Sequence, residues 1–349
     1  MSPVGTPAAK QVLTVSGLTV AYRSAAGWMR PAVEDVSFSL RESEVLGLAG
    51  ESGCGKSTVA YTLLGERRSN SRILAGRLML DGQDLLALPD RDLQRLRGTR
   101  ISIVPQNPAP SLTPTMTCGH QVTEVLAYHG LARGAAARRR ALELLEQVGF
   151  SDPPGTFAKY PHQISGGQQQ RVVIAMAVAG RPRVVVLDEP TTGLDVTTQR
   201  RILELLRVLR DRFGTAMLYV SHDLAALAQL CDRVAVMYAG RLVEVAAARI
   251  LFGAPRHPYT RALLASIPRL DRPPPAEPAL TGGLRRDGLT TGCAFTPRCG
   301  FAAMPTCATT PQALASVGAD HEAACWRWRE VAAATGAGRI GAEAVARAG

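Results

Sequence analysis

The segment from Gly50 to Ser57 has the residue types and the spacing of a phosphate-binding loop. It reads Gly-Glu-Ser-Gly-Cys-Gly-Lys-Ser and fits the pattern G-x-x-x-x-G-K-[ST]. The glycines let the backbone curl so that its N–H groups point at phosphates, while Lys56 can reach the β- and γ-phosphates and the Ser57 hydroxyl can bind Mg²⁺. The loop follows a predicted buried strand and precedes a predicted helix, which makes a chance glycine turn the weaker interpretation. We therefore expect nucleotide contacts from Gly50, Glu51, Ser52, Gly53, Cys54, Gly55, Lys56, Ser57 and Thr58.

Two carboxylates follow a second apolar run, Val184 to Leu187. At the carboxyl end of a strand, Asp188 can hold the Mg²⁺ shell and Glu189 can polarise an attacking water. Alone, such a pair is as well explained by two solvated acids that end a strand. The upstream phosphate loop favours the catalytic interpretation, although a kinase or a GTPase would satisfy both motifs.

The segment Ser165 to Gln168, Ser-Gly-Gly-Gln, predicts a second anion-binding surface. It places a hydroxyl and backbone N–H groups at the start of a helix predicted from Gln168 to Gly180. This segment is too far along the chain to belong to the same phosphate cradle. Two such surfaces suit a pair of facing subunits, in which each ATP lies between the phosphate loop of one and the Ser-Gly-Gly-Gln segment of the other.

Together these motifs resemble those of ABC ATPases over about two thirds of the chain, from Val12 to Val245. Ile164 to Arg171 is similar to the family's LSGGQ signature, with isoleucine in place of leucine, and Gly193 stands where the D-loop has alanine. The resemblance implies that Tyr22 stacks on adenine, that Gln106 touches Mg²⁺ and couples to a membrane partner, and that His222 contacts the γ-phosphate. The implied catalytic residues are Lys56, Gln106, Glu189 and His222; the implied Mg²⁺ residues are Ser57, Gln106 and Asp188; the implied contacts from the facing subunit are Ser165, Gly166, Gly167, Gln168 and Asp195.

Several segments resemble the ATPases of oligopeptide and dipeptide importers: 50–58, 105–107, 111–114, 160–163 and 256–268. The last, which reads RHPYTRALLASIP, is the most specific because it lies outside the catalytic motifs. Members of this branch import peptides, and near relatives import nickel, metallophores or sugars. The resemblance implies a second, related ATPase subunit in a heterodimer, two transmembrane permeases, an extracytoplasmic binding protein and a position at the cytoplasmic face of the membrane.

Four of the seven cysteines lie late in the chain, at Cys293, Cys299, Cys307 and Cys325. Four thiolates in one short segment of a cytosolic protein suit a soft metal centre. Their spacings of five, seven and seventeen residues lack the C-x₂-C knuckle of structural zinc, which favours a [4Fe–4S] cluster. The segment also resembles the branch's C-terminal cysteine element. Zinc, with His321 as a possible substitute ligand, and unligated thiols remain alternatives.

The elements that must position these residues are short strands alternating with helices. Residues 12–15, 18–21 and 33–40 predict antiparallel strands, and the apolar runs 45–49, 101–104, 184–187, 216–220 and 234–237 predict buried parallel strands. Helices are predicted over 121–180, including 141–150, and over 201–212. The alternation indicates an α/β fold with a mainly parallel sheet. With the resemblance, this becomes the P-loop NTPase fold of ABC ATPases, with an antiparallel β subdomain and a helical subdomain at about 107–180.

The domain organisation follows from composition. We expect an ATPase domain over residues 1–250 and an extension over 251–349 that contains the cysteines at 293–325. Prolines between 268 and 278 predict a stiff linker, and residues 332–349 predict a loosely ordered tail. No apolar run reaches about 18 residues and no signal-peptide pattern opens the chain, so we expect a cytoplasmic protein with a peripheral membrane role.

The net charge of +11 raises the possibility of a nucleic-acid partner. The positive charge is nearly all arginine and is spread along the chain, so we expect no nucleic acid. A non-transport ABC protein acting on nucleic acid would usually carry two cassettes or a long coiled-coil insertion, and this chain has neither. A third possibility is an iron or redox sensor in which the ATPase is secondary.

Overall fold

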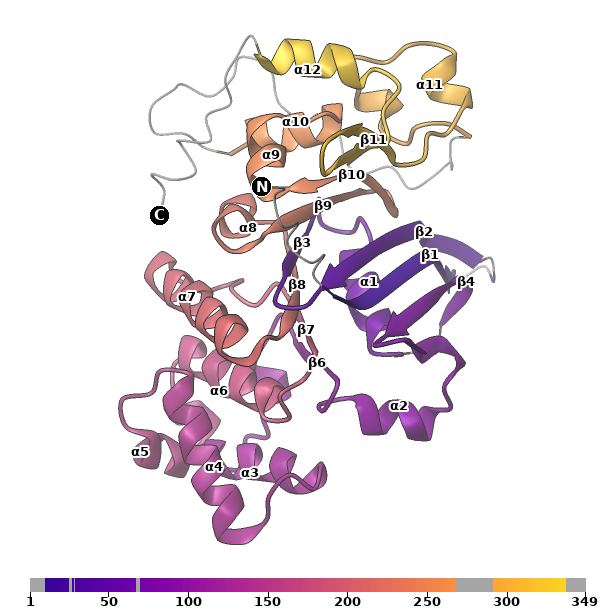
Figure 1. Cartoon of the computed structure of the whole chain (residues 1–349). Coiled ribbons are helices and arrows are strands. Elements are labelled where there is room, and N and C mark those ends of the chain that lie inside the picture. Colours follow the sequence, from indigo (N-terminus) through magenta and orange to yellow (C-terminus); the bar gives the residue numbers. More distant parts are fainter. Residues whose placement is uncertain (1–9, 25–26, 28, 67–69, 268–290, 337–349) are drawn as a thin grey trace, which may run out of the picture.

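The computed structural model of the chain describes residues 10–24, 27, 29–66, 70–267 and 291–336. Two sheets lie at its centre (Figure 1). The smaller is antiparallel in the order β2-β1-β4-β5, with strands β1 (Gln11–Arg23), β2 (Met29–Arg41), β4 (Ser71–Leu80) and β5 (Gln83–Asp84). The larger has the order β11-β12-β10-β9-β3-β8-β7-β6, with strands β3 (Val45–Ala49), β6 (Ile101–Val104), β7 (Val184–Asp188), β8 (Ala216–Ser221), β9 (Arg233–Tyr238), β10 (Arg241–Ala247), β11 (Ala315–Gly318) and β12 (His321–Ala323).

The five strands from β9 to β6 run parallel and form the predicted α/β core. Their side chains are buried on both faces, as the apolar runs predicted. In β7, Val184 and Val186 pack toward helix α1 (Lys56–Leu63) and the small sheet. Val185 and Leu187 pack toward the opposite layer, which holds α6 (Gly166–Val178), α7 (Val196–Phe213) and α8 (Leu224–Leu230). This alternation of period two places α1 between the sheets (Figure 1).

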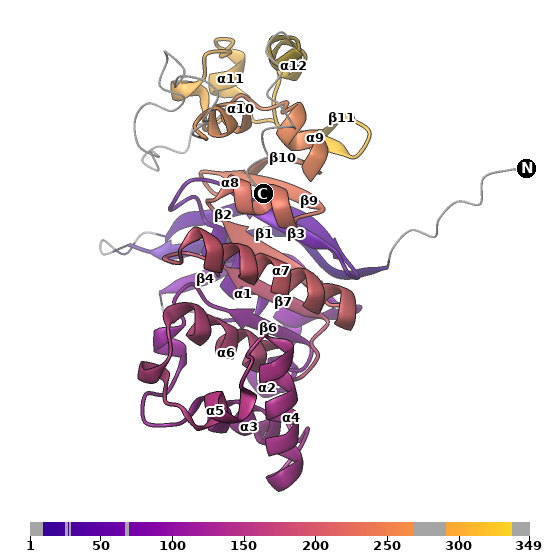
Figure 2. The same cartoon turned by 90° about the vertical axis from the view of Figure 1, so that its left-hand side faces the viewer.

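The predicted helical insert is present at one end of the molecule (Figures 1 and 2). It contains α3 (Cys118–Tyr128), α4 (Gly134–Gln147), α5 (Pro153–Ala158) and α6; α2 (Asp90–Leu96) precedes β6. The predicted helix 141–150 is the second half of α4, which ends before Gly149 with its φ of 84°. Of the helices that the structure describes, none combines the length and apolar character needed to cross a bilayer.

Several predictions of local structure are wrong. Residues 12–15 and 18–21 belong to one strand, β1, because a register shift at Gly17, with φ of 60°, keeps the chain within the sheet instead of turning it. Strand β4 was missed because its first half is largely exposed and so lacks an apolar pattern. Helix α12 (Trp328–Gly336) occupies the start of the tail predicted to be loose. The predicted proline linker and the rest of the tail lie outside the described residues.

The C-terminal extension is built onto the main sheet. Strand β12 pairs antiparallel with β10, and β11 pairs with β12, so the hairpin lengthens the sheet beyond β10. Helices α9 (Ala248–Gly253), α10 (Pro258–Ala265), α11 (Thr306–Thr309) and α12 cover this end (Figures 1 and 2). The sequence pattern around the cysteines did not predict this hairpin, whose two strands are only four and three residues long.

A buried carboxylate joins the extension to β10. Glu244 is fully buried and accepts hydrogen bonds from the backbone N–H groups of Arg256, at 2.6 Å, and His257, at 2.9 Å. Its Oε1 also lies 2.7 Å from Nε2 of His321 in β12. Three segments thus share one carboxylate, and each bond is charge-assisted in a site that excludes water.

His257 makes the stability of this region depend on pH. Burial lowers the pKa of His257 to about 4, with Glu244 opposing the shift, and its Nδ1 accepts a hydrogen bond from the N–H of Tyr259. The neutral ring is therefore the folded form, and the unfolded chain takes up the extra proton below its ordinary pKa of about 6.5. Lowering the pH from about 7 to about 5 should reduce the free energy of unfolding through this group by about 2 kcal/mol. Urea denaturation at both pH values measures this change in the free energy of unfolding. His257→Asn keeps a capping acceptor without titrating, and an equal loss in that variant would contradict the assignment.

Candidate nucleotide-binding site

The predicted phosphate loop lies between the carboxyl end of β3 and the start of α1. Gly50 and Gly55 have φ values of 149° and 114°. A Cβ at Gly50 would lie 2.3 Å from the carbonyl oxygen of Met237, and one at Gly55 would lie 2.6 Å from that of Ala32, so both positions require glycine. The buried Lys56 ammonium donates to the carbonyl oxygens of Gly50, at 2.8 Å, and Glu51, at 3.0 Å. The Lys56 ammonium therefore lies inside the phosphate loop, bonded to the loop's own backbone.

The predicted Mg²⁺ residues Ser57 and Asp188 are in contact. The Ser57 hydroxyl donates to Oδ1 of Asp188 at 3.2 Å, although 131 positions separate the two residues. Asp188 is only 2% exposed, at the carboxyl end of β7. A hydroxyl and a carboxylate are oxygen donors of the kind that Mg²⁺ prefers beside phosphates, so this pair fits the ion.

Glu189 is the centre of a second group of predicted residues. Its Oε2 accepts hydrogen bonds from Nε2 of Gln106, at 3.0 Å, and from the hydroxyl of Thr192, at 3.1 Å. Its Oε1 lies 3.1 Å from Nδ1 of His222. The residues Gln106, Glu189 and His222 follow the neighbouring strands β6, β7 and β8, whose carboxyl ends meet at one edge of the sheet. A carboxylate held at this edge can accept a proton from an attacking water.

Thr192 was not among the predicted residues. It lies three positions after Glu189, and its hydroxyl donates to that carboxylate. A threonine in a turn carries no signal of such a role in the sequence. Tyr22, by contrast, was predicted, and the structure brings its hydroxyl to 3.3 Å from Oγ1 of Thr58 in α1. Its ring therefore lies beside the phosphate-loop helix.

The Ser165–Gln168 segment forms a separate group at the starts of α6 and α7. Ser165 caps α6: its Oγ accepts from the N–H of Gln168, whose side chain accepts from the N–H of Ser165. Gly166 and Gly167 hold the first helical positions, whose N–H groups have no partner within the helix. A Cβ at Gly167 would lie 2.5 Å from the side chain of Thr198 in α7. Ser165–Gln168 therefore lie at the start of α6, on a different element from the phosphate loop, and their role in anion binding stays a prediction.

Asp195 belongs to the same group. It caps α7 and accepts hydrogen bonds from the hydroxyl of Thr198, at 2.7 Å, and from its N–H, at 3.0 Å. These bonds lower the pKa of Asp195 and keep the carboxylate charged at the positive end of the helix dipole.

The four late cysteines lie near one another in the extension. Burial raises the pKa of Cys293, Cys299 and Cys325, to about 11 for Cys299 and about 12 for Cys325, and the charges of neighbouring cysteines raise it further. Among the residues that the structure describes, no three side chains of His, Cys, Asp or Glu gather closely enough to hold one metal ion. His321, the possible substitute ligand, has its Nε2 directed at Glu244 instead. The metal centre stays a prediction.

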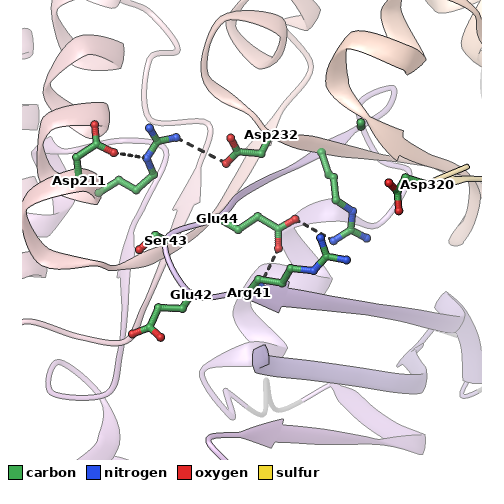
Figure 3. Close-up of a pocket in the computed structure, with 10 residues that line it drawn as sticks. Arg41, Glu42, Ser43, Glu44, Asp211, Asp232 and Asp320 are labelled. Carbon is green, nitrogen blue, oxygen red and sulfur yellow. Dashed lines mark hydrogen bonds and ion pairs between the residues drawn. The ribbon is translucent and has the colours of Figure 1, made fainter. Parts of the chain in front are cut away.

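A charged hollow of about 480 Å³ lies elsewhere on the surface (Figure 3). Its lining comes from the segments before and at the starts of β3 and β9, from the end of α7, from the end of β10 and from the turn between β11 and β12, whereas the predicted site lies at the carboxyl ends of β3 and β7. Its charges pair with one another: Arg233 with Glu44 at 2.9 Å, and Arg210 with Asp211 at 2.7 Å and with Asp232 at 3.6 Å. The hollow contains none of the predicted site residues.

A glycine loop around a buried lysine, with a carboxylate at the end of a parallel strand of the same sheet, defines a P-loop nucleoside triphosphatase. Residues 33–192 match the family model described as ABC transporter, and residues 243–307 match the oligopeptide/dipeptide transporter C-terminal region. The chain is 42% identical to a probable peptide ABC transporter ATP-binding protein, y4tR, of Sinorhizobium fredii, over 86% of this chain and 90% of that protein. It is 41% identical to the oligopeptide transport ATP-binding protein AppD of Bacillus subtilis, over 86% of this chain and 92% of that protein. A solved structure of the dimeric ATP-binding cassette MJ0796 bound to ADP and Pi is similar, with a TM-score of 0.60 and 28% identity over 68% of this chain and 98% of that one.

The chain belongs to the ATP-binding proteins of ABC transporters, in the branch that carries the oligopeptide/dipeptide transporter C-terminal region. It is an ATPase with the ABC cassette fold. The predicted family and fold class are confirmed.

Proposed function

We propose that this chain is the ATP-hydrolysing subunit of an importer of di- and oligopeptides. The assignment of peptides as the cargo rests on the match of residues 243–307 to the oligopeptide/dipeptide transporter C-terminal region. This region lies outside the catalytic motifs. The names of the relatives point the same way, since they are peptide and oligopeptide transport ATP-binding proteins. Nickel, metallophores and sugars are the alternative cargoes.

The contacts around β7 support distinct roles in hydrolysis. Ser57 and Asp188 would hold Mg²⁺, which supplies charge stabilisation at the phosphates, and Gln106 would reach the same ion. Lys56 and His222 would contact the γ-phosphate, Tyr22 would stack on adenine, and Glu189 would orient and deprotonate the attacking water. Ser165–Gln168 and Asp195 would complete the ATP site of a facing subunit, because helix starts attract phosphate.

The partners follow from the same proposal. The chain would pair with a second, related ATPase subunit at the cytoplasmic face of the membrane. The pair would drive two transmembrane permeases, which receive the substrate from an extracytoplasmic binding protein. The exposed loop around Asn107, directly after Gln106, would carry nucleotide-driven movement to a permease.

Uptake measurements test the cargo. Cells that lack this chain should lose uptake of labelled di- and oligopeptides, and the wild-type chain should restore it. A chain with Lys56→Ala should not, because the loop loses its only ammonium. Loss of nickel or sugar uptake with peptide uptake intact would replace the peptide assignment.

We also propose that Cys293, Cys299, Cys307 and Cys325 hold a [4Fe–4S] cluster. The support is that the N–H of Cys293 donates to the carbonyl of Cys307 at 2.7 Å and that the four side chains are partly or completely buried. A bound cluster would ligate the four cysteines as thiolates through iron. Iron and sulfide analysis with an absorbance spectrum of the anaerobically purified chain tests this. Stoichiometric zinc, or no metal, would overturn it.

A further inference from the structure

The phosphate loop is bonded to the C-terminal extension at Glu51. Nη1 and Nη2 of Arg298 donate to Oε2 and Oε1 of Glu51, each at 3.1 Å, so the guanidinium forms a bidentate pair with the carboxylate. The backbone N–H of Glu51 donates to the hydroxyl of Tyr259 at 2.9 Å. Arg298 lies among the late cysteines and Tyr259 lies in α10, so two parts of the extension hold one residue of the loop.

The extension presents Arg298 in a rigid setting. Tyr238, Tyr259 and Phe295 pack with ring centroids 4.5 to 5.4 Å apart, and Arg298 lies over Tyr238 and Phe295 at 5.9 Å from each centroid. The side chain of Arg298 is only 10% exposed, and that of Glu51 is 23% exposed. The backbone on either side is fixed as well, because the N–H of Cys293 and the hydroxyl of Thr296 both donate to the carbonyl of Cys307. An Arg–carboxylate pair that is bidentate, mostly shielded and backed by aromatic rings is of the stronger kind.

Glu51 is also one of the two residues whose carbonyl oxygens bind the Lys56 ammonium. Lys56 donates to the carbonyl oxygens of Gly50 and Glu51, while Tyr259 accepts from the N–H of Glu51. The backbone of Glu51 is therefore bonded from both sides, by the loop lysine and by the extension. A shift of this backbone would displace the loop N–H groups that face the phosphates.

We propose that Arg298 and Tyr259 are positioning residues that hold the phosphate loop in its nucleotide-binding shape, which makes the extension a working part of the ATP site. The inference rests on the assignment of residues 50–57 as that loop. Neither side chain contacts Gln106, Glu189 or His222 in the hydrogen bonds of the described residues, so the effect should fall on binding and not on the hydrolytic step.

Nucleotide titration of the full-length purified chain tests the proposal. Arg298→Gln should raise the Kd for MgATP by about tenfold, and Glu51→Gln should raise it by a similar factor. The double variant should be no weaker than the stronger single one, because both remove the same pair. Arg298→Lys should raise the Kd less than Arg298→Gln does. Lysine keeps the positive charge but cannot donate to both carboxylate oxygens as the planar guanidinium does. Tyr259→Phe should raise the Kd severalfold by leaving a loop N–H without its acceptor.

The control is Arg183→Gln, which removes another arginine that is ion-paired, with Glu42 at 2.7 Å and Asp81 at 3.6 Å, and that lies just before β7, at the amino ends of the parallel strands. It should bind MgATP like the wild type. In the assembled transporter, Arg298→Gln should raise the KM for ATP while kcat stays within about twofold. Wild-type affinity in both Arg298→Gln and Glu51→Gln, additive losses in the double variant, or an equal loss in the control would each overturn the inference. Failure of the wild-type chain to bind MgATP would instead refute the nucleotide assignment itself.

Discussion

Glu189→Gln is expected to lower ATP turnover by about 10²–10⁴-fold and to leave ATP binding intact. The glutamine has the same shape and keeps an oxygen for Gln106 or Thr192, but it cannot accept a proton from water at neutral pH. Binding should survive because the contacts of Lys56, Ser57 and Asp188 are unchanged. In the proposed pair of ATPase subunits, the bound but unhydrolysed ATP should then hold the pair closed.

Turnover is measured as phosphate release by the assembled transporter, and binding by nucleotide titration of the same sample. Glu204→Gln is the matched control, since Glu204 is an exposed carboxylate in α7 that takes no part in the site. It should hydrolyse ATP at the wild-type rate. Undiminished turnover in Glu189→Gln would refute the assignment of Glu189 as the residue that activates water.

Glu244→Ala is expected to have the largest effect on stability, lowering the free energy of unfolding by about 3–5 kcal/mol. The change removes a carboxylate shared by β10, the Arg256–His257 segment and β12. Two buried backbone N–H groups and the His321 ring would lose their acceptor. Because these bonds join the extension to the main sheet, the extension should detach first.

Urea denaturation measures the loss, and limited proteolysis shows where it begins. Cleavage within the extension should become faster than cleavage within the helices around α4. Glu322→Ala is the control, because Glu322 is adjacent to His321 in β12 but exposed. A loss below about 1 kcal/mol in Glu244→Ala would show that the buried carboxylate contributes little to docking the extension.

The parallel core was predictable because its strands are buried on both faces and are therefore apolar throughout. The same reasoning failed at the edges of the sheets. Strand β4 is half exposed, and β1 contains a bulge that resembles a turn in sequence. In both places the hydrogen bonds of neighbouring strands, and not the local pattern, decide that the chain is extended.

The proposed catalytic residues were identified one by one in the sequence, but the side chains that contact them were not. Gln106, Glu189 and His222 each follow an apolar run, and the rule that parallel strands end at one edge brings them together. Thr192 and Arg298 gave no such signal. The motif around Arg298 drew attention to its cysteines, and nothing there indicates that the arginine contacts the phosphate loop.

The sequence by itself determined the phosphate loop of this ATPase. Gly50 and Gly55 meet a local requirement, positive φ angles that glycine adopts without strain, and Lys56 supplies the ammonium at the spacing of the motif. The tertiary structure alone decided that Arg298 meets Glu51, across 247 positions. That meeting depends on β12 joining β10 and on Glu244 fixing the extension there, and these are long-range pairings that no local pattern encodes.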